Sequence, residues 1–237
     1  MKVIFLLGIF FAGFLLFQKG KTEPIKIVEI VSTTTEKKVE VIPAIKPKKE
    51  IPGKTLISIP FISQAPKKIW DALHEDACEE ASLLMVDKFL QKKSAGTVEE
   101  QDKEIKSMVQ YETKNKYGLS VTLEELASIA QNYSGMENPR VEKEATIEKI
   151  KQELADGRPV IIPAAGKLLP NPNFKNGGPN YHMLVVKGYD ADGFITNDPG
   201  TRKGENFRYT FQALFNTIHD WNPKNIMLGQ KAYLVFD

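Results

Sequence analysis

The sequence predicts an α+β domain in which N-terminal helices are followed by a mainly antiparallel sheet. Between residues 76 and 157, helix-capping patterns repeat ahead of apolar residues at helical spacing. After Gly157, short apolar and β-branched runs alternate with turn residues, which is typical of strands. The charges are balanced, with 32 Lys and Arg against 30 Asp and Glu. This balance provides no basic field and argues against nucleic acid as a partner.

Four helices are expected before residue 158, and three of them begin at threonine caps. Thr97 and Thr122 are each followed three residues later by glutamate, which is the capping-box pattern. Thr146 is expected to cap a further helix that ends at Gly157. The first helix has the same pattern in Asp76-Ala77-Cys78-Glu79. Cys78 is therefore expected in the first turn of a helix whose apolar face packs inward.

The strands are expected on either side of these helices. A short first strand is predicted over residues 56–60. The later strands are predicted over residues 159–163, 182–188, 194–198, 207–209 and 232–236, with a helix over 210–218. Residues 164–180 form a 17-residue loop rich in Gly, Pro and Asn that ends two residues before His182. It is interpreted either as a lid or binding loop or as a surface loop without a role.

The N-terminal part of the chain has the features of an export segment. Residues 3–17 form an unbroken apolar run between Lys2 and Lys19. At 1.5 Å per residue the run spans roughly 22 Å, less than the ~30 Å hydrocarbon core of a bilayer, which favours a signal peptide. No small-residue cleavage site follows Phe17, so a retained membrane anchor is the alternative.

Three regions follow from this organisation. Residues 1–20 are predicted to be a signal peptide or membrane anchor, residues 21–55 a flexible Lys- and Pro-rich linker, and residues 56–237 the folded domain. The protein is expected to be exported. It would face outward from the membrane through its N-terminal helix, or be secreted if that helix is cleaved.

The candidate chemistry centres on the single cysteine. One cysteine excludes an internal disulfide, and with three scattered histidines it argues against a structural zinc site. A helix N-terminus favours the thiolate form of Cys78. His182, at the start of a strand, is a candidate base, and Asp198, at the end of the next strand, is a candidate to orient it. Gln64 is a candidate amide donor to a developing oxyanion.

Each of these residues also has an ordinary structural explanation. A lone cysteine early in a helix is most often a small buried hydrophobe, and Asp198 before Pro199-Gly200 resembles a turn residue. Asn197 is an alternative partner for His182, because strand alternation points only one of the two towards it. The chain order of the four candidates and the unpaired cysteine in an exported protein favour the functional interpretation.

Other candidate sites are weaker. His74 is expected on the surface, in the loop before the Cys78 helix. His219 lies at a helix end, where its charge alone explains it. Asp190, Asp192 and Asp198 suggest calcium, but the twelfth position from Asp190 is Thr201 rather than a glutamate, which excludes an EF-hand loop.

Four stretches resemble the papain-like superfamily, and within it the double-glycine leader peptidases, family thirty-nine of the cysteine peptidases. They are Ile59-Pro60-Phe61-Ile62-Ser63-Gln64, Ala77-Cys78-Glu79-Glu80-Ala81-Ser82-Leu83-Leu84-Met85, Tyr181-His182-Met183-Leu184-Val185-Val186-Lys187-Gly188-Tyr189-Asp190 and Asn197-Asp198-Pro199-Gly200. The resemblance covers residues 56–237. It implies a papain-like fold, with Cys78 as nucleophile, His182 as base, Asp198 as orienting residue and Gln64 as oxyanion donor.

The expected function is that of an exported or membrane-tethered cysteine peptidase, monomeric and without a metal or organic cofactor, that acts on a peptide or protein substrate. The family usually has Cys-Gly-Pro where this chain has Cys78-Glu79-Glu80. Both glutamates are expected to point away from Cys78 into water. Their presence motivates an alternative, an inactive domain that binds peptides or cell-wall components. A third candidate is another acyl transfer, such as peptidoglycan amide hydrolysis or transglutamination.

Overall fold

The computed structural model describes residues 50–237, and its centre is a sheet in which all neighbouring strands of this part of the chain pair antiparallel. The strand order is β2-β7-β3-β4-β5-β6, and β1 pairs with β4. The strands are β1 (Thr55–Leu56), β2 (Pro139–Lys143), β3 (Val160–Ala165), β4 (Tyr181–Tyr189), β5 (Phe194–Asn197), β6 (Phe207–Tyr209) and β7 (Ala232–Phe236). With helices on both sides of this sheet, the domain has the predicted α+β fold class.

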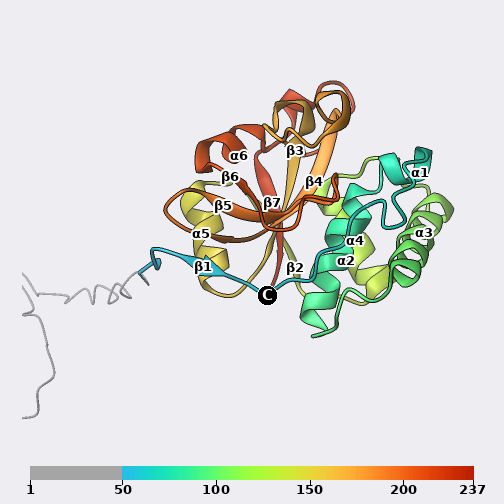
Figure 1. The fold of residues 1–237 in the computed structure, drawn as a ribbon, viewed down its shortest axis with the longest axis horizontal. Helices are drawn as coiled ribbons and strands as arrows, with labels where there is room; N and C mark the ends of the chain where they lie inside the picture. The colour runs from blue at the N-terminus through green and yellow to red at the C-terminus, as the bar shows by residue number, and fades with distance from the viewer. Residues whose placement is uncertain (1–49) are drawn as a thin grey trace, which may run out of the picture. The chain divides into compact units, whose positions relative to one another are not determined.

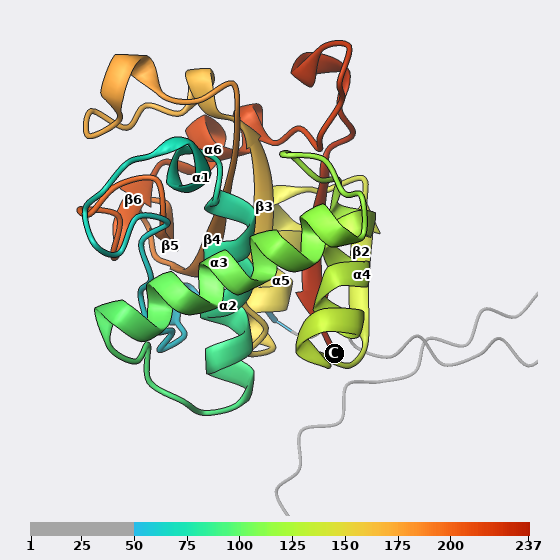
Figure 2. The ribbon, with the colours of Figure 1, turned by 90° about the vertical axis from the view of Figure 1, so that its right-hand side faces the viewer.

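Helices cover both faces of the sheet, as Figure 1 shows. They are α1 (Ala72–Glu75), α2 (Cys78–Leu90), α3 (Val98–Lys114), α4 (Leu123–Ser134), α5 (Ile147–Ala155) and α6 (Phe211–Thr217). The group α2, α3 and α4 lies on one side of the sheet and α5 and α6 lie on the other. In the view turned by 90°, α3 crosses in front of α2 (Figure 2).

Strand alternation explains the two cores. Along β4, Met183 and Val185 pack with the α2 side, whereas Leu184 and Val186 pack with the α5 side. All nine residues of β4 are buried. A strand that is covered on both faces consists mainly of apolar residues, and for this reason β4 can be predicted from the sequence.

The threonine caps are confirmed. Thr97 and Thr122 each accept the backbone N–H three residues on, and Glu100 and Glu125 return a bond to the cap, so both capping boxes are complete. The Thr146 side chain accepts the Lys149 N–H and caps α5 without a returning glutamate.

The predicted cap of the Cys78 helix is wrong. The N-cap of α2 is Ala77, which makes no side-chain capping bond, and Asp76 instead ends the short helix α1. Glu79 does not reach back to the cap because its side chain bonds to the Cys78 thiol. The placement of Cys78 as the first residue of a 13-residue helix agrees with expectation.

Two elements were not predicted. The strand β2 begins at a proline and alternates charged residues, and it pairs only with β7 at the edge of the sheet. The helix α1 has four residues, too few to show a periodic pattern. The first strand is also shorter than predicted, because only Thr55–Leu56 pairs with β4 before the chain leaves the sheet.

The predicted export segment of residues 1–20 and most of the predicted linker lie outside the described residues. Within residues 50–237, no helix combines the length and apolar character that a membrane crossing needs. The contacts of the folded part begin before residue 56, since Tyr189 donates its hydroxyl to the Pro52 carbonyl at 2.7 Å.

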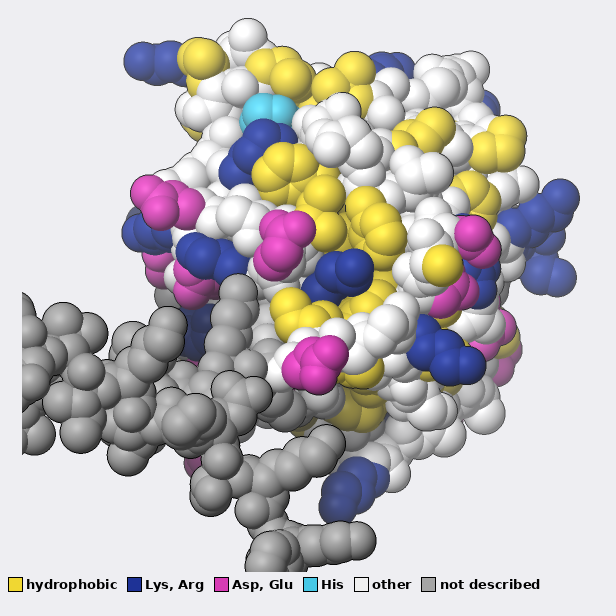
Figure 3. Space-filling model, turned by 90° about the vertical axis from the view of Figure 1, so that its left-hand side faces the viewer, with side chains coloured by type: hydrophobic (Ala, Val, Ile, Leu, Met, Phe, Trp, Pro, Cys, Tyr) yellow, Lys and Arg dark blue, Asp and Glu magenta, His cyan; other side chains and the backbone are white. Residues whose placement is uncertain are grey.

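The outer face formed by α5, α6 and the neighbouring strands carries apolar side chains among charges (Figure 3). Lysines cover part of its aromatic surface. The ammonium group of Lys151 lies 4.4 Å from the centroid of the Phe211 ring, and that of Lys231 lies 4.7 Å from the Phe215 ring. These cation–π contacts allow the aromatic rings to stay half-buried at the surface.

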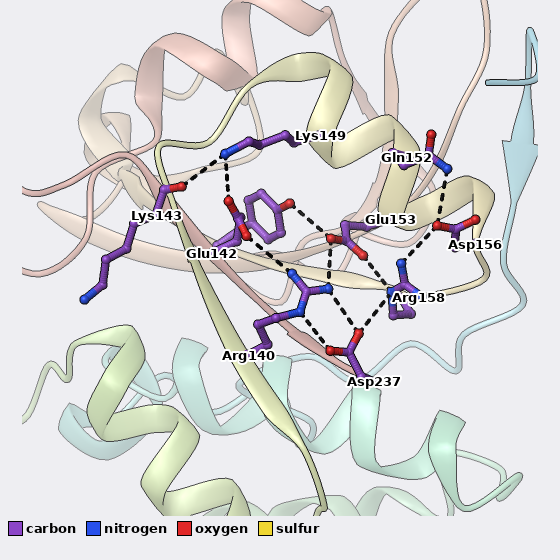
Figure 4. A network of polar contacts seen from close by, with 10 residues as sticks. Arg140, Glu142, Lys143, Lys149, Gln152, Glu153, Asp156, Arg158 and Asp237 are labelled. Atoms are coloured by element: carbon purple, nitrogen blue, oxygen red, sulfur yellow. Dashed lines mark hydrogen bonds and ion pairs between the residues drawn. The ribbon is translucent and has the colours of Figure 1, made fainter. Parts of the chain in front are cut away.

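A polar network joins β2, α5 and the last residue of the chain (Figure 4). Its centre is the buried Glu153, which accepts bonds from Arg140 at 3.0 Å, Arg158 at 2.6 Å and the Tyr233 hydroxyl at 3.3 Å. Arg140 also forks onto Asp237 with bonds of 2.8 and 3.0 Å. Charged side chains that compensate one another in this way hold the edge strand β2 against the helix.

Removing the centre of this network should destabilise the domain. Glu153→Ala removes one acceptor from each of two guanidinium groups and the acceptor of the Tyr233 hydroxyl, and we expect a loss of about 3 kcal/mol in the free energy of unfolding. Asp190→Ala, which breaks the exposed pair with Arg208, is the matched control and should cost much less than Glu153→Ala. Urea denaturation of the two variants measures both values, and equal losses would contradict this account.

Candidate active site

The Asp198 carboxylate is fully buried and accepts hydrogen bonds from four groups. Its Oδ1 contacts His182 Nε2 at 2.8 Å and accepts the Gly200 N–H at 3.0 Å. Its Oδ2 accepts from the Tyr209 hydroxyl at 2.7 Å and from Asn171 Nδ2 at 3.0 Å. Burial acts to raise the pKa of Asp198, but the His182 ring and these bonds outweigh it and hold the pKa below its usual range. The group is therefore a fixed negative charge.

Strand pairing brings Asp198 and His182 together. In the antiparallel pair of β4 and β5, Val185 lies opposite Asn197, the last residue of β5. Asp198 follows directly, at the point where the chain leaves the sheet, and its side chain reaches the His182 ring. The two residues are 16 positions apart and lie on the two strands of one hairpin, so the contact follows from local topology.

Phe174, Gly200 and Asp198 surround the His182 ring. The ring makes an edge contact with Phe174, with centroids 5.3 Å apart. A Cβ atom at Gly200 would lie 2.8 Å from His182 Cε1, so only glycine fits there without a shift. The Nε2 atom is held by Asp198, and the other ring nitrogen, Nδ1, is buried without a hydrogen-bond partner. That nitrogen is the one available to accept a proton.

The Cys78 thiol lies beside the same strand. The backbone amide of Met183, the residue that follows His182, acts to lower the pKa of the thiol. Its hydrogen-bond partner among the described side chains is Glu79, with Sγ 2.8 Å from Oε2. The structure thus brings Cys78 next to the His182 segment of β4, but the thiol hydrogen bonds to Glu79 rather than to the imidazole.

The expectation that Glu79 and Glu80 stay in water is wrong. Their relative exposures are 2% and 4%. The two side chains and Glu112 of α3 form a buried carboxyl cluster in which each has one oxygen without a hydrogen-bond partner. Glu80 and Glu112 are hydrogen-bonded to each other. Helix rotation alone does not decide their exposure, because α3 covers the side of α2 on which they lie, so they meet protein rather than water.

Burial governs the protonation of this cluster. Burial raises the pKa of Glu79 to about 8, and it raises that of Glu112 to about 7. Burial, followed by the Glu79 charge and hydrogen bond, also raises the pKa of the Cys78 thiol well above its usual range. At pH 7 Glu79 is mostly neutral, so its charge opposes the thiolate only at higher pH.

Gln64 lies in the segment that precedes α1 and is 3% exposed. Its Nε2 donates to the carbonyls of His74 at 2.8 Å and Glu75 at 3.0 Å, and its Oε1 is buried without a partner. The segment is fixed by the Gln64 N–H, which donates to the Pro199 carbonyl at 3.1 Å. Gln64 is therefore held close to Asp198 in the fold, while its amide hydrogens are directed towards α1.

Asn197 has a different place from Asp198. Its Nδ2 donates to the Ile59 carbonyl at 3.2 Å and its Oδ1 accepts from Lys187 at 3.4 Å. Of the two candidates for orienting His182, Asp198 makes the contact. Asn197 ties the end of β5 to the segment that leads to Gln64.

His74 is buried, contrary to the expectation of a surface residue. Its Nδ1 lies 2.6 Å from Asp71 and its Nε2 lies 3.0 Å from Asp102 of α3. These contacts anchor α1, whose backbone accepts from Gln64. His219, the other alternative, has Nδ1 3.1 Å from the Gly229 carbonyl. Among the described residues, no group of His, Cys, Asp and Glu side chains could hold a metal ion.

A cavity of about 840 Å³ opens beside His182 and Gln64. The predicted 164–180 loop supplies much of its wall, including Phe174, which agrees with the interpretation of that stretch as a binding loop. Cys78 is not among the lining residues. The thiol therefore lies behind the cavity surface in this conformation.

Sequence reasoning missed three residues of the site. Asn171 and Tyr209 hold Asp198, and Glu79 holds the thiol hydrogen. Asn171 lies in the predicted 164–180 loop, and the length and composition of that loop are the sequence signal that points to it. Tyr209 follows the alternation of a predicted strand and carried no separate signal. Burial and then the Asp198 charge raise the pKa of Tyr209, so this hydroxyl stays protonated and donates.

Comparison with known proteins finds a family profile that matches most of this chain and solved structures that resemble it. Residues 56–224 match the sequence profile of the Peptidase_C39 like family. No curated protein matches the chain. Solved structures that resemble it include one from Bacillus anthracis that carries the description of a C39-like peptidase. That structure is 17% identical, with a TM-score of 0.45, and the match covers 78% of this chain and 97% of the other.

The Glu79 contact predicts an unusual pH dependence for the thiol. Glu79 ionises around pH 8, and its charge then opposes formation of the adjacent thiolate. We expect Glu79→Gln to react with iodoacetamide several-fold faster than the wild type above pH 8, with a smaller difference at pH 6 to 7. Alkylation rates against pH measure this, and circular dichroism checks the fold.

Glu153→Gln, which changes a buried carboxyl remote from the thiol, is the matched control and should leave the alkylation profile unchanged. Identical profiles for Glu79→Gln and the wild type would show that the contact has no influence on the thiol.

Proposed function

This chain belongs to the Peptidase_C39 like family, and on that premise we propose that it hydrolyses peptide bonds with a Cys78–His182–Asp198 triad. The observation that carries the proposal is the state of the His182 ring. Asp198 holds one ring nitrogen, and the other is buried and has no partner, beside the strand residue that contacts the thiol. A base that is oriented on one side and vacant on the other is the arrangement that nucleophilic catalysis needs.

In the proposed reaction, the Cys78 thiol first breaks its bond to Glu79 and turns towards His182. The Nδ1 atom of His182 takes the thiol proton, and the sulfur attacks the carbonyl carbon of the substrate. The tetrahedral intermediate collapses to a thioester when His182 returns the proton to the leaving amine. Water, deprotonated by His182, then attacks the thioester and releases the acid product with the free thiol.

Asp198 supports both proton transfers. Its negative charge stabilises the imidazolium that forms transiently, and its contact with Nε2 fixes the tautomer that leaves Nδ1 open. Asn171 and Tyr209 in turn keep the carboxylate in place. These two are positioning residues, since they act through Asp198.

The oxyanion is proposed to bind the Gln64 amide and the Cys78 backbone N–H. Gln64 Nε2 is occupied by two backbone carbonyls in this conformation. Its role therefore requires that a substrate carbonyl displaces at least one of these bonds. Its buried, unpartnered Oε1 indicates that the present arrangement does not satisfy the whole amide.

A second candidate function is peptide binding without turnover. One observation favours it, namely that the thiol bonds to Glu79 behind the cavity surface. Labelling with an epoxide peptide probe separates the two candidates. A peptidase would be labelled at Cys78 and would cleave members of a proteome-derived peptide library, whereas a binder would retain peptides without either reaction.

The orienting role of Asp198 gives a direct test of the triad. Asp198→Asn keeps the size of the side chain but removes the charge that holds His182, and we expect kcat to fall by about 10²- to 10⁴-fold. Hydrolysis of a library-derived peptide measures it, with circular dichroism as the check on folding. The matched control is Asp190→Asn on an exposed ion pair, which should keep wild-type turnover. Full activity in Asp198→Asn would rule out this triad.

We propose further that the protein is exported, on the basis of the apolar run over residues 3–17. Cell fractionation should place the full chain in the membrane or outside the cell. Deletion of residues 1–20 should yield a chain that folds and stays inside. Recovery of the full chain from the cytoplasm would contradict the proposal.

A further inference from the structure

The cavity beside His182 has a wall of unpaired cations. Four positively charged side chains line it, namely Lys167, Lys175, Arg202 and Lys203. Two carboxylates, Glu75 and Asp76, line it as well. None of these four cations forms an ion pair with a described residue. All four are exposed, and Lys167 donates to the Asn176 carbonyl at 3.2 Å. The half-buried Arg140 and Arg158, by contrast, are neutralised by Glu153.

The cations and the carboxylates come from different elements. Lys167 and Lys175 belong to the β3–β4 loop, and Arg202 and Lys203 to the β5–β6 loop. Glu75 and Asp76 lie at the end of α1. Neither Glu75 nor Asp76 forms an ion pair with a described residue. Burial, followed by the charge of Glu75, raises the pKa of Asp76. The two charged walls therefore do not neutralise each other.

The loop that carries Arg202 and Lys203 is held in shape next to the imidazole. The Asp198 N–H donates to the Gly204 carbonyl at 3.0 Å, and the Gly204 N–H donates to the Thr201 carbonyl at 3.1 Å. The Lys203 N–H donates to Thr201 Oγ1 at 3.2 Å. The same loop contains Gly200, where an added Cβ would lie 2.8 Å from His182 Cε1. The two cations thus follow, by two and three residues, a position packed closely beside the candidate base.

From these observations we propose that the cavity binds a carboxylate of the substrate, so that the enzyme prefers peptides with an acidic group within about three residues of the scissile bond. The inference rests on the proposed peptidase function and specifies its substrate class. An anion between the two loops would satisfy charges that repel one another when the cavity is empty. Trp70 and Phe174, which also line the cavity, provide apolar surface for the rest of the peptide.

The carboxylate has two possible sources, an acidic side chain or the C-terminus of a peptide. The experiment therefore uses four versions of one peptide that the full chain cleaves. They combine Glu or Gln at the positions flanking the scissile bond with a free or an amidated C-terminus. We expect kcat/KM to be about tenfold higher for a version with a carboxylate than for the version with none, and the advantage to shrink as salt is added.

The variants assign the effect to the loop. Arg202→Gln with Lys203→Gln should reduce the preference for the acidic peptide to less than about twofold. The matched control, Lys103→Gln with Lys114→Gln, removes two exposed cations of α3 that do not line this cavity and should keep the preference. Cleavage of all four peptides at equal rates would overturn the inference and leave the peptidase proposal intact.

If no peptide is cleaved, the peptidase proposal fails, and binding still tests the cavity. Fluorescence anisotropy of the labelled Glu and Gln peptides with the full chain then provides the readout. Tighter binding of the acidic peptide that is lost in the Arg202/Lys203 variant would support the inference. Equal binding of the two peptides would overturn it.

Discussion

The buried Asp198 carboxylate is the interaction on which the site depends. A fully buried charge is costly unless every oxygen is satisfied, and here four donors from four parts of the chain meet it. They come from β4, β6, the β3–β4 loop and the turn after β5. The need to satisfy one charge therefore fixes the position of the imidazole, the shape of the loop that carries Arg202 and the course of the cavity wall.

The second constraint is the meeting of α2 with β4. The helix presents Cys78 at its first residue, where the unpaired N–H groups and the macrodipole favour negative charge. The surrounding carboxyl cluster acts in the opposite direction. Because the Cys78 thiol bonds to Glu79, the mechanism proposed above requires a rotation of the Cys78 side chain. The site thus places an imidazole held by Asp198 near a thiol held by Glu79.

Much of the fold could be predicted because local signals and tertiary structure agree. The capping boxes at Thr97 and Thr122, and the apolar runs of β3 and β4, report on backbone groups and on burial within a few residues. The contact of His182 with Asp198 follows from a hairpin and was equally accessible. The charged strand β2 was not, because its pairing with β7 is a long-range contact that leaves no pattern in Pro139–Lys143 itself.

The failures in the site have one cause. Glu79, Glu80 and His74 were expected in water because charged side chains usually are. Their burial depends on α3, which follows them in the chain by some twenty residues or more and covers α2. Which face of a helix a later helix covers is decided by packing across the domain, and no spacing within residues 74–80 encodes it.

The carboxyl cluster also makes folding a proton-consuming process. In the unfolded chain these groups titrate near 4.5, whereas burial raises the pKa of Glu79 to about 8 and that of Glu112 to about 7 in the folded domain. Between pH 4.5 and the raised pKa values, the folded domain binds more protons than the unfolded chain. The two carboxyl groups therefore contribute fully to stability below pH 4.5, and the contribution is lost as the pH rises through 7 and 8. A chain that folds in a mildly acidic compartment gains stability from the same carboxyl groups that restrain its thiol.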